Sequence, residues 1–184
     1  MQNPWKKLSS KQLHKTPWLS LIEDQVIRPD GKQDTYTYIQ TNLAVAVVAL
    51  NQKNEIYLVG QYRYPTDGYS WEIIEGGGEK GETGLDTAKR ELKEEAGLTA
   101  NKWTKLGGDL HLSNCISSEV GEIYLAEELT IGEADPEPTE ILTIKTVDLD
   151  SAMKMLLSGE ITDTLTEVAL YRLKAHLEER NGCN

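Results

Sequence analysis

Four glutamates and one arginine are spaced so that their side chains would meet around one point. Glu94 and Glu95 follow Glu91 by three and four residues, which puts both beside Glu91 on one side of an α-helix. Arg90 stands beside them, and Glu82 lies in the loop before the helix and can fold back. Like charges at this spacing repel each other, so the cluster costs stability unless a cation offsets it. Hard divalent ions bind carboxylate oxygens, and such ions can polarise a phosphoryl oxygen and activate water.

The surrounding residues predict the helix that this cluster needs. Thr83 is a suitable N-cap with Asp86 as the partner of a capping box, and Gly97 is suited to end the helix. An apolar stripe at steps of three and four can bury against a sheet, and it consists of Leu85, Ala88, Leu92 and Ala96. An exposed acidic helix is the alternative interpretation, and it would account for Glu94 and Glu95 taken by themselves.

The stretch from Gly76 to Leu98 resembles the Nudix box. That pattern is G, five residues, E, seven residues and REUxEExGU, where U is aliphatic, and every fixed position matches here. The resemblance implies an α+β Nudix fold, in which a mixed β-sheet is sandwiched between helices. It also implies a pyrophosphohydrolase that depends on Mg²⁺, with Mn²⁺ as a possible substitute.

The same resemblance assigns roles within the box. Glu91 and Glu95 are implied to be the principal metal ligands, and Glu82 and Glu94 to contribute to the site. Arg90 is implied to orient the carboxylates, and its planar fork can pair with Glu94 at i to i+4. We therefore expect Arg90, Glu94 and Glu95 to be catalytic, and Glu82, Glu91 and Glu95 to bind metal through their side chains.

Positions outside the helix supply further candidates. Gly77 lets the backbone approach metal or phosphate closely, and the resemblance makes the backbone carbonyl of Glu75 an extra metal ligand. Arg63 suits bidentate binding of phosphate, although an arginine that extends from a strand edge toward water is an alternative. Trp18 could stack on a nucleobase, although aromatic residues on strands more often pack in cores or interfaces.

Most of the chain resembles the branch of the superfamily that hydrolyses ADP-ribose and other nucleoside-diphosphate sugars. Four segments carry this resemblance: the β-rich residues 18–40, Gln61–Pro65 (similar to QxRxx), Trp71–Gly77 (similar to WExPaG) and Gly159–Asp163. The branch implies a single Nudix domain over residues 1–184. Within it, residues 1–41 form an N-terminal β-hairpin extension that joins a homodimer, and residues 42–184 form the catalytic core.

The expected reaction is hydrolysis of ADP-ribose to AMP and ribose 5-phosphate. Many ADP-ribose hydrolases have an SPG segment after the box, where this chain has Ser113-Asn114-Cys115. Because Asn114 replaces the proline, another sugar nucleotide such as GDP-mannose is an alternative substrate. A non-catalytic ligand sensor on the same fold is a rival function, but such proteins commonly lose glutamates that this chain keeps.

The segment that follows resembles a loop bearing a catalytic carboxylate. It runs Ile116-Ser117-Ser118-Glu119, and Glu119 is the candidate general base, with Glu122 as a lesser candidate. An ordinary solvated loop residue is an equally good interpretation of Glu119.

Composition limits the remaining possibilities. The formal net charge is −11 and the pI about 4.8, which argues against a nucleic-acid-binding surface. No run of 18 apolar residues is present to span a membrane, and the two cysteines form no CxxC pair. We expect a cytoplasmic enzyme whose partners are a small-molecule nucleoside-diphosphate substrate and a second copy of the chain.

Overall fold

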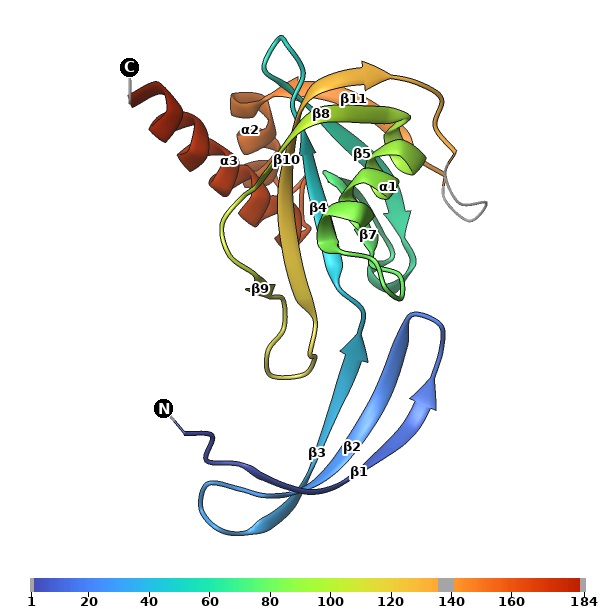
Figure 1. The fold of residues 1–184 in the computed structure, drawn as a ribbon, viewed down its shortest axis with the longest axis vertical. Coiled ribbons are helices and arrows are strands. Elements are labelled where there is room, and N and C mark those ends of the chain that lie inside the picture. The colour runs from blue at the N-terminus through green and yellow to red at the C-terminus, as the bar shows by residue number, and fades with distance from the viewer. Residues whose placement is uncertain (1, 136–140, 183–184) are drawn as a thin grey trace. The chain divides into compact units, whose positions relative to one another are not determined.

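The structure is a computed structural model that describes residues 2–135 and 141–182. The chain forms two compact units, whose elements Figure 1 shows. The first unit comprises the residues up to Leu43 together with His111–Val120, and the second comprises Ala44–Leu110 together with the residues from Gly121 onward. Over the described ranges, no helix is both long and apolar enough to cross a membrane.

The first unit contains a three-stranded antiparallel sheet in the order β1-β2-β3. Its strands are β1 (Lys6–Lys15), β2 (Leu19–Ile27) and β3 (Gln33–Thr41). The hairpin predicted from the sequence is formed by β2 and β3, and Gly31 in its turn has a positive φ of 84°. The additional strand β1 was not predicted, because its sequence lacks a sustained apolar alternation. All ten of its residues are exposed.

The second unit is built around a mixed sheet in the order β7-β4-β10-β8. Strands β4 and β10 are parallel, and the other neighbours are antiparallel. The continuous apolar run at residues 43–50 predicts a buried strand, and it forms β4, which lies inside this sheet. The bounds are β4 (Ala44–Ala49), β7 (Ile74–Gly77), β8 (Leu98–Lys105), β9 (Leu110–His111) and β10 (Val120–Ile131).

A smaller antiparallel sheet has the order β11-β5-β6. Its strands are β5 (Glu55–Arg63), β6 (Gly68–Glu72) and β11 (Thr143–Asp148), and the 3-10 helix η1 (Tyr64–Thr66) connects β5 to β6. The sequence predicts one strand at residues 71–74, but the structure divides it at Ile73. Before this residue the chain pairs with β5, and after it the chain pairs with β4. One short segment therefore belongs to both sheets.

In the part of the chain that the structure describes, three α-helices accompany the sheets: α1 (Gly84–Ala96), α2 (Leu149–Ser158) and α3 (Thr164–Gly182). Both α1 and α3 pack against β4 (Figure 1). The hydroxyl of Thr166 in α3 donates a hydrogen bond to the Glu75 carboxyl group at 2.8 Å. The next residue of β7, Gly76, faces Glu91 of α1. Because successive strand residues point to opposite faces, the sheet lies between α1 and α3, which confirms the predicted sandwich.

Helix α1 begins and ends where its sequence signals predict. The Thr83 side chain accepts a hydrogen bond from the Asp86 N–H at 3.2 Å, and the Asp86 carboxylate accepts one from the Thr83 N–H at 3.3 Å. Gly97 ends the helix with a positive φ of 64°. Ala88 and Leu92 of the predicted apolar stripe are fully buried. Local capping and one buried stripe thus set the position and rotation of α1.

Removal of the cap is expected to destabilise the fold. We predict that Thr83→Ala lowers the free energy of unfolding by about 1 kcal/mol, because the Asp86 N–H loses its acceptor. Thr83→Ser, which keeps the hydroxyl, should unfold close to the wild type. Urea unfolding followed by circular dichroism measures both variants, and equal stability of the alanine variant and the wild type would contradict this role.

Candidate functional site

Arg90 lies at the centre of the charged residues of the box. Its guanidinium donates hydrogen bonds to Glu82 at 3.1 Å, Glu91 at 2.7 Å and Glu94 at 2.9 Å. A further hydrogen bond, of 2.8 Å, goes to the backbone carbonyl of Gly77. The i to i+4 pair with Glu94 is the one expected from the sequence. One side chain of α1 thus connects three carboxylates to the end of β7.

These contacts change the acidity of the groups involved. Hydrogen bonds from Arg90, followed by the Glu79 N–H, lower the pKa of Glu82 to about 2. Hydrogen bonding to Glu82 in turn raises the pKa of Arg90 above its ordinary value. Glu82 is therefore ionised throughout the physiological pH range. The loop before α1 folds back toward the helix, as the sequence predicts.

Glu91 is held closely against the backbone of β7. It is only 9% exposed, and a Cβ atom added to Gly76 would overlap its carboxyl group. Any side chain at position 76 would therefore displace the Glu91 carboxylate. The box requires glycine at position 76 because of this close approach, and not because of an unusual backbone angle.

Glu95 reaches the outer edge of the same strand. It is 3% exposed, and its carboxylate accepts a hydrogen bond from the Glu75 N–H at 3.3 Å. Within the second unit β7 is an edge strand with β4 as its neighbour. The N–H and C=O of a strand residue point to the same side, so the Glu75 carbonyl also lies at this edge. Burial of Glu91 and Glu95 excludes the alternative of a simple exposed acidic helix.

The donor groups at this edge suit a hard divalent cation. Two buried carboxylates and one backbone carbonyl are oxygen ligands of the type that Mg²⁺ prefers, and the absence of a Cβ at Gly76 leaves room for them. Within residues 2–135 and 141–182, no three acidic, histidine or cysteine side chains form a metal-ligand group by themselves. The guanidinium of Arg90 lies among the carboxylates of the box instead.

The side chain of Glu75 points away from this edge, toward α3. It accepts the hydrogen bond from Thr166. Burial, and then the nearby Asp163 carboxylate, raise the pKa of Glu75 well above its ordinary range. Neither Thr166 nor Asp163 was a candidate from the sequence, although Asp163 stands at an N-cap position for α3, where its carboxylate accepts the Thr166 N–H at 2.7 Å.

Arg63 is paired with a buried carboxylate. Its Nε lies 3.1 Å from both carboxylate oxygens of Glu72, and its Nη2 donates a further hydrogen bond to Glu72. Glu72 is 2% exposed, whereas the side chain of Arg63 is 42% exposed. Hydrogen bonding to Glu72 raises the pKa of Arg63, with smaller contributions from the charges of Glu75 and Glu95. Sequence reasoning selected Arg63 but not Glu72, although both belong to the segments quoted for the family resemblance.

Glu122 is engaged in a separate ionic network near the start of α1. It accepts hydrogen bonds from Lys105 and from the Tyr124 hydroxyl, both at 2.7 Å. Burial and this contact raise the pKa of Tyr124 to about 12. A Cβ added to Gly84, the first residue of α1, would overlap the Glu122 carboxylate. This geometry favours a role for Glu122 in seating α1 against β10.

The two other candidate residues, Trp18 and Glu119, belong to the first unit. Trp18 lies in the turn that connects β1 to β2, and it is 74% exposed. Glu119 follows the loop that contains Asn114, and its N–H donates a hydrogen bond to the Ser117 hydroxyl at 3.3 Å. The structure therefore groups Glu75, Gly77, Glu82, Arg90, Glu91, Glu94 and Glu95 in the second unit, with Arg63 in the same unit.

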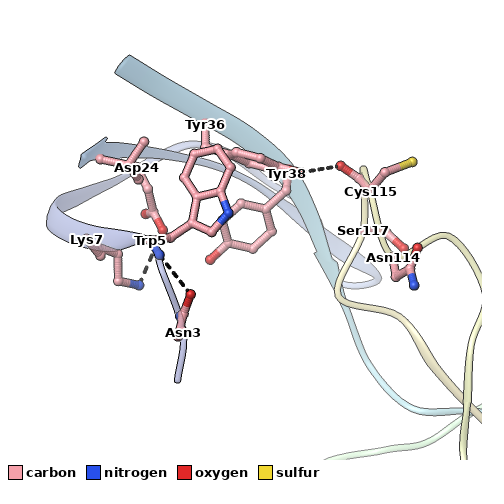
Figure 2. Close-up of a pocket in the computed structure, with 10 residues that line it drawn as sticks. Asn3, Trp5, Lys7, Asp24, Tyr36, Tyr38, Asn114, Cys115 and Ser117 are labelled. Carbon is pink, nitrogen blue, oxygen red and sulfur yellow. Dashed lines mark hydrogen bonds and ion pairs between the residues drawn. The ribbon is translucent and has the colours of Figure 1, made fainter. Parts of the chain in front are cut away.

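A hollow of about 470 Å³ lies in the first unit and includes Asn114 in its lining (Figure 2). Trp5 and Tyr36 form an edge-to-face pair with ring centroids 5.5 Å apart. The Tyr36 hydroxyl donates a hydrogen bond to the Cys115 carbonyl at 2.7 Å, so β3 fixes the loop that carries the departure from the SPG pattern. The lining as a whole combines aromatic rings with amide and charged groups.

Comparison with known proteins identifies the family. Residues 40–165 match the NUDIX domain, and residues 5–39 match the nucleoside diphosphate sugar hydrolase N-terminal domain. The chain therefore belongs to the NUDIX domain family, and it is a Nudix hydrolase of the ADP-ribose pyrophosphatase-like type. Nudix hydrolases generally use divalent metal ions.

Individual relatives extend this likeness over most of the chain. The chain is 33% identical to an ADP-ribose pyrophosphatase of Bacillus subtilis, over 92% of each chain. It is 32% identical to an ADP-ribose pyrophosphatase of Mycobacterium tuberculosis, over 89% of this chain and 80% of the relative. A crystal structure of an ADP compounds hydrolase has the same fold, with a TM-score of 0.86 and 22% identity over 98% of this chain and 97% of that one.

A side chain at position 76 should interfere with the box directly. We predict that Gly76→Ala lowers hydrolytic kcat/KM on the order of 10²-fold, because the Glu91 carboxylate must move away from β7. Gly108→Ala is the control, since a Cβ there meets nothing within 4 Å. Steady-state kinetics with added metal measures both variants. Normal activity of a folded Gly76→Ala protein would show that the position of Glu91 does not matter.

Proposed function

We propose that the protein hydrolyses the pyrophosphate bond of a nucleoside-diphosphate sugar, with ADP-ribose as the preferred substrate and AMP and ribose 5-phosphate as products. The observation that carries this proposal is the group of carboxylates around Arg90 at the edge of β7. Support for the substrate comes from the two relatives named ADP-ribose pyrophosphatase and from the family match of residues 5–39.

The proposed cofactor is Mg²⁺, for which Mn²⁺ can substitute. Its ligands in this proposal are the carboxylates of Glu91, Glu95 and Glu82 and the backbone carbonyl of Glu75. Bound there, the ion would polarise a phosphoryl oxygen, lower the pKa of water and stabilise developing negative charge. The buried positions of Glu91 and Glu95 support this assignment, since buried charges are normally paired or coordinated.

The remaining residues of the box hold this arrangement in place. Arg90 keeps Glu82, Glu91 and Glu94 within hydrogen-bonding distance of one group, so little reorganisation is needed before reaction. Glu94, whose side chain is 37% exposed, would contribute a further carboxylate to the catalytic site. The open backbone at Gly77, where an added Cβ meets nothing within 4 Å, gives phosphate oxygens access to the site.

Three further residues complete the proposed mechanism. Arg63 would bind a substrate phosphate with the part of its guanidinium that Glu72 does not occupy. Trp18, with its exposed indole, would stack on the nucleobase. Glu119 would act as the general base that takes the proton of the attacking water.

The substrate is tested by product release from a panel of ADP-ribose, ADP-glucose, GDP-mannose, NADH and dGTP, each with Mg²⁺ and with Mn²⁺. We expect the highest kcat/KM with ADP-ribose. A preference for GDP-mannose would keep the chemistry and reject the substrate. Failure to hydrolyse any member with either metal would favour a non-catalytic ligand sensor.

The proposed metal site predicts the effect of removing one charge. Glu95→Gln should lower kcat by more than about 10³-fold while the melting temperature changes little, because a neutral amide is a poor ligand for a hard cation. Glu178→Gln, at an exposed position near the end of α3, is the matched control and should retain full activity. Near-normal turnover by the folded Glu95→Gln protein would reject this assignment.

We also propose that the first unit forms a homodimer. Strand β1 is a fully exposed edge strand, and such an edge is a template for pairing with another chain. Several large apolar residues of the unit are exposed, namely Trp5, Leu8, Leu13, Trp18 and Leu19. Light scattering at micromolar concentration should give twice the chain mass, and a monomer would reject the proposal.

A further inference from the structure

The Thr166 hydroxyl joins α3 to the segment that connects the two sheets. Thr166 is fully buried. Its Oγ1 accepts a hydrogen bond from the Ile73 N–H at 3.2 Å and donates one to the Glu75 carboxyl group at 2.8 Å. A single side chain therefore holds residues on both sides of Ile74, at the start of β7.

Strand β7 needs support of this kind because it lies at the edge of its sheet. Over the described residues its strand neighbour is β4, so no second strand on the other side limits rotation of the Glu75 backbone. The backbone N–H of Glu75 donates a hydrogen bond to the Glu95 carboxylate. Rotation of Glu75 about the strand axis would move its backbone N–H and C=O together, away from the glutamates of α1.

The contacts of Thr166 oppose that rotation. The Thr166 N–H is itself fixed by the Asp163 carboxylate at 2.7 Å, so the hydroxyl is presented from the first turn of a long helix and not from a mobile loop. The side chain of Glu75 is thus anchored on the α3 face of the sheet. This anchor keeps the backbone N–H and C=O of Glu75 directed toward the carboxylates of Glu91 and Glu95.

We propose that Thr166 is a positioning residue for the divalent-cation site, acting through Glu75 from the opposite face of the sheet. This inference rests on the proposed function only in placing the cation at Glu75, Glu91 and Glu95. Thr166 does not touch substrate or cation in this scheme. Its hydroxyl sets the orientation of the backbone carbonyl that completes the ligand set, and partners that orient metal ligands strongly affect metal affinity.

The test is the affinity of the full-length protein for Mn²⁺ alone, measured by titration calorimetry or by electron paramagnetic resonance. Thr166→Val keeps the shape of the side chain and removes the hydroxyl. We expect the Kd for Mn²⁺ to rise about 10- to 100-fold. At saturating metal, kcat for ADP-ribose should fall while KM stays within about twofold, since substrate contacts are unchanged. Thr166→Ser, which restores the hydroxyl, should return the Kd to near the wild-type value.

A control separates positioning from loss of stability. Leu173→Ala removes a fully buried side chain of the same helix, and it should lower the melting temperature without weakening Mn²⁺ binding. If Leu173→Ala weakens Mn²⁺ binding as much as Thr166→Val does, Thr166 has only a structural role. Wild-type Mn²⁺ affinity in folded Thr166→Val protein overturns the proposal as well.

If the valine variant does not fold, Thr166→Cys takes its place, because a thiol is a poor hydrogen-bonding group of similar size. Unchanged Mn²⁺ affinity in that folded variant would also reject the role. If the wild type binds no Mn²⁺, the metal site of the proposed function fails, and the role of Thr166 fails with it. If the wild type binds Mn²⁺ and the Thr166 variant binds it with the same affinity, only the proposed role of Thr166 is rejected.

Discussion

One guanidinium holds together the carboxylates of the candidate site in the second unit. Without Arg90, three glutamates of the box would repel each other across a short distance, and the loop before α1 would lose its main attachment to the helix. The hydrogen bonds of Arg90 reach Glu82, Glu91 and Glu94 as well as the backbone at Gly77. The same contacts that relieve the repulsion also fix the position of α1 relative to β7.

Strand β7 is the second element on which the site depends. Gly76 lets Glu91 approach from one face, while Glu75 sends its side chain to α3 on the other. Since β7 is an edge strand, its outward backbone groups remain available for contacts such as the one with Glu95. A central strand would use these groups for pairing with a neighbour. The candidate site lies at a sheet edge because the outward N–H and C=O groups of β7 are not used for strand pairing.

Much of this site could be predicted from local sequence, because helix α1 is defined by local signals. Its cap at Thr83, its end at Gly97 and the face shared by its glutamates all depend on residues within one or two turns. Contacts between distant segments could not be predicted in this way. The pair of Arg63 with Glu72 and the bridge from Thr166 to Glu75 depend on how β5, β6 and α3 meet. Strand β1 was missed for a similar reason: its pairing with β2 creates the strand, and its own pattern does not.

The change of sheet at Ile73 has a consequence for how the site can vary. Glu72, which holds Arg63, and Glu75, whose backbone N–H donates a hydrogen bond to Glu95, are separated by only two residues, a span of about 10 Å in extended chain. In the proposed mechanism, the cation and Arg63 would each contact a different phosphate of the substrate. The length of this segment would set the distance between them. Substitutions can alter either end separately, but an inserted or deleted residue would change the span itself. The distance between Glu72 and the β7 edge therefore depends on the length of this short segment.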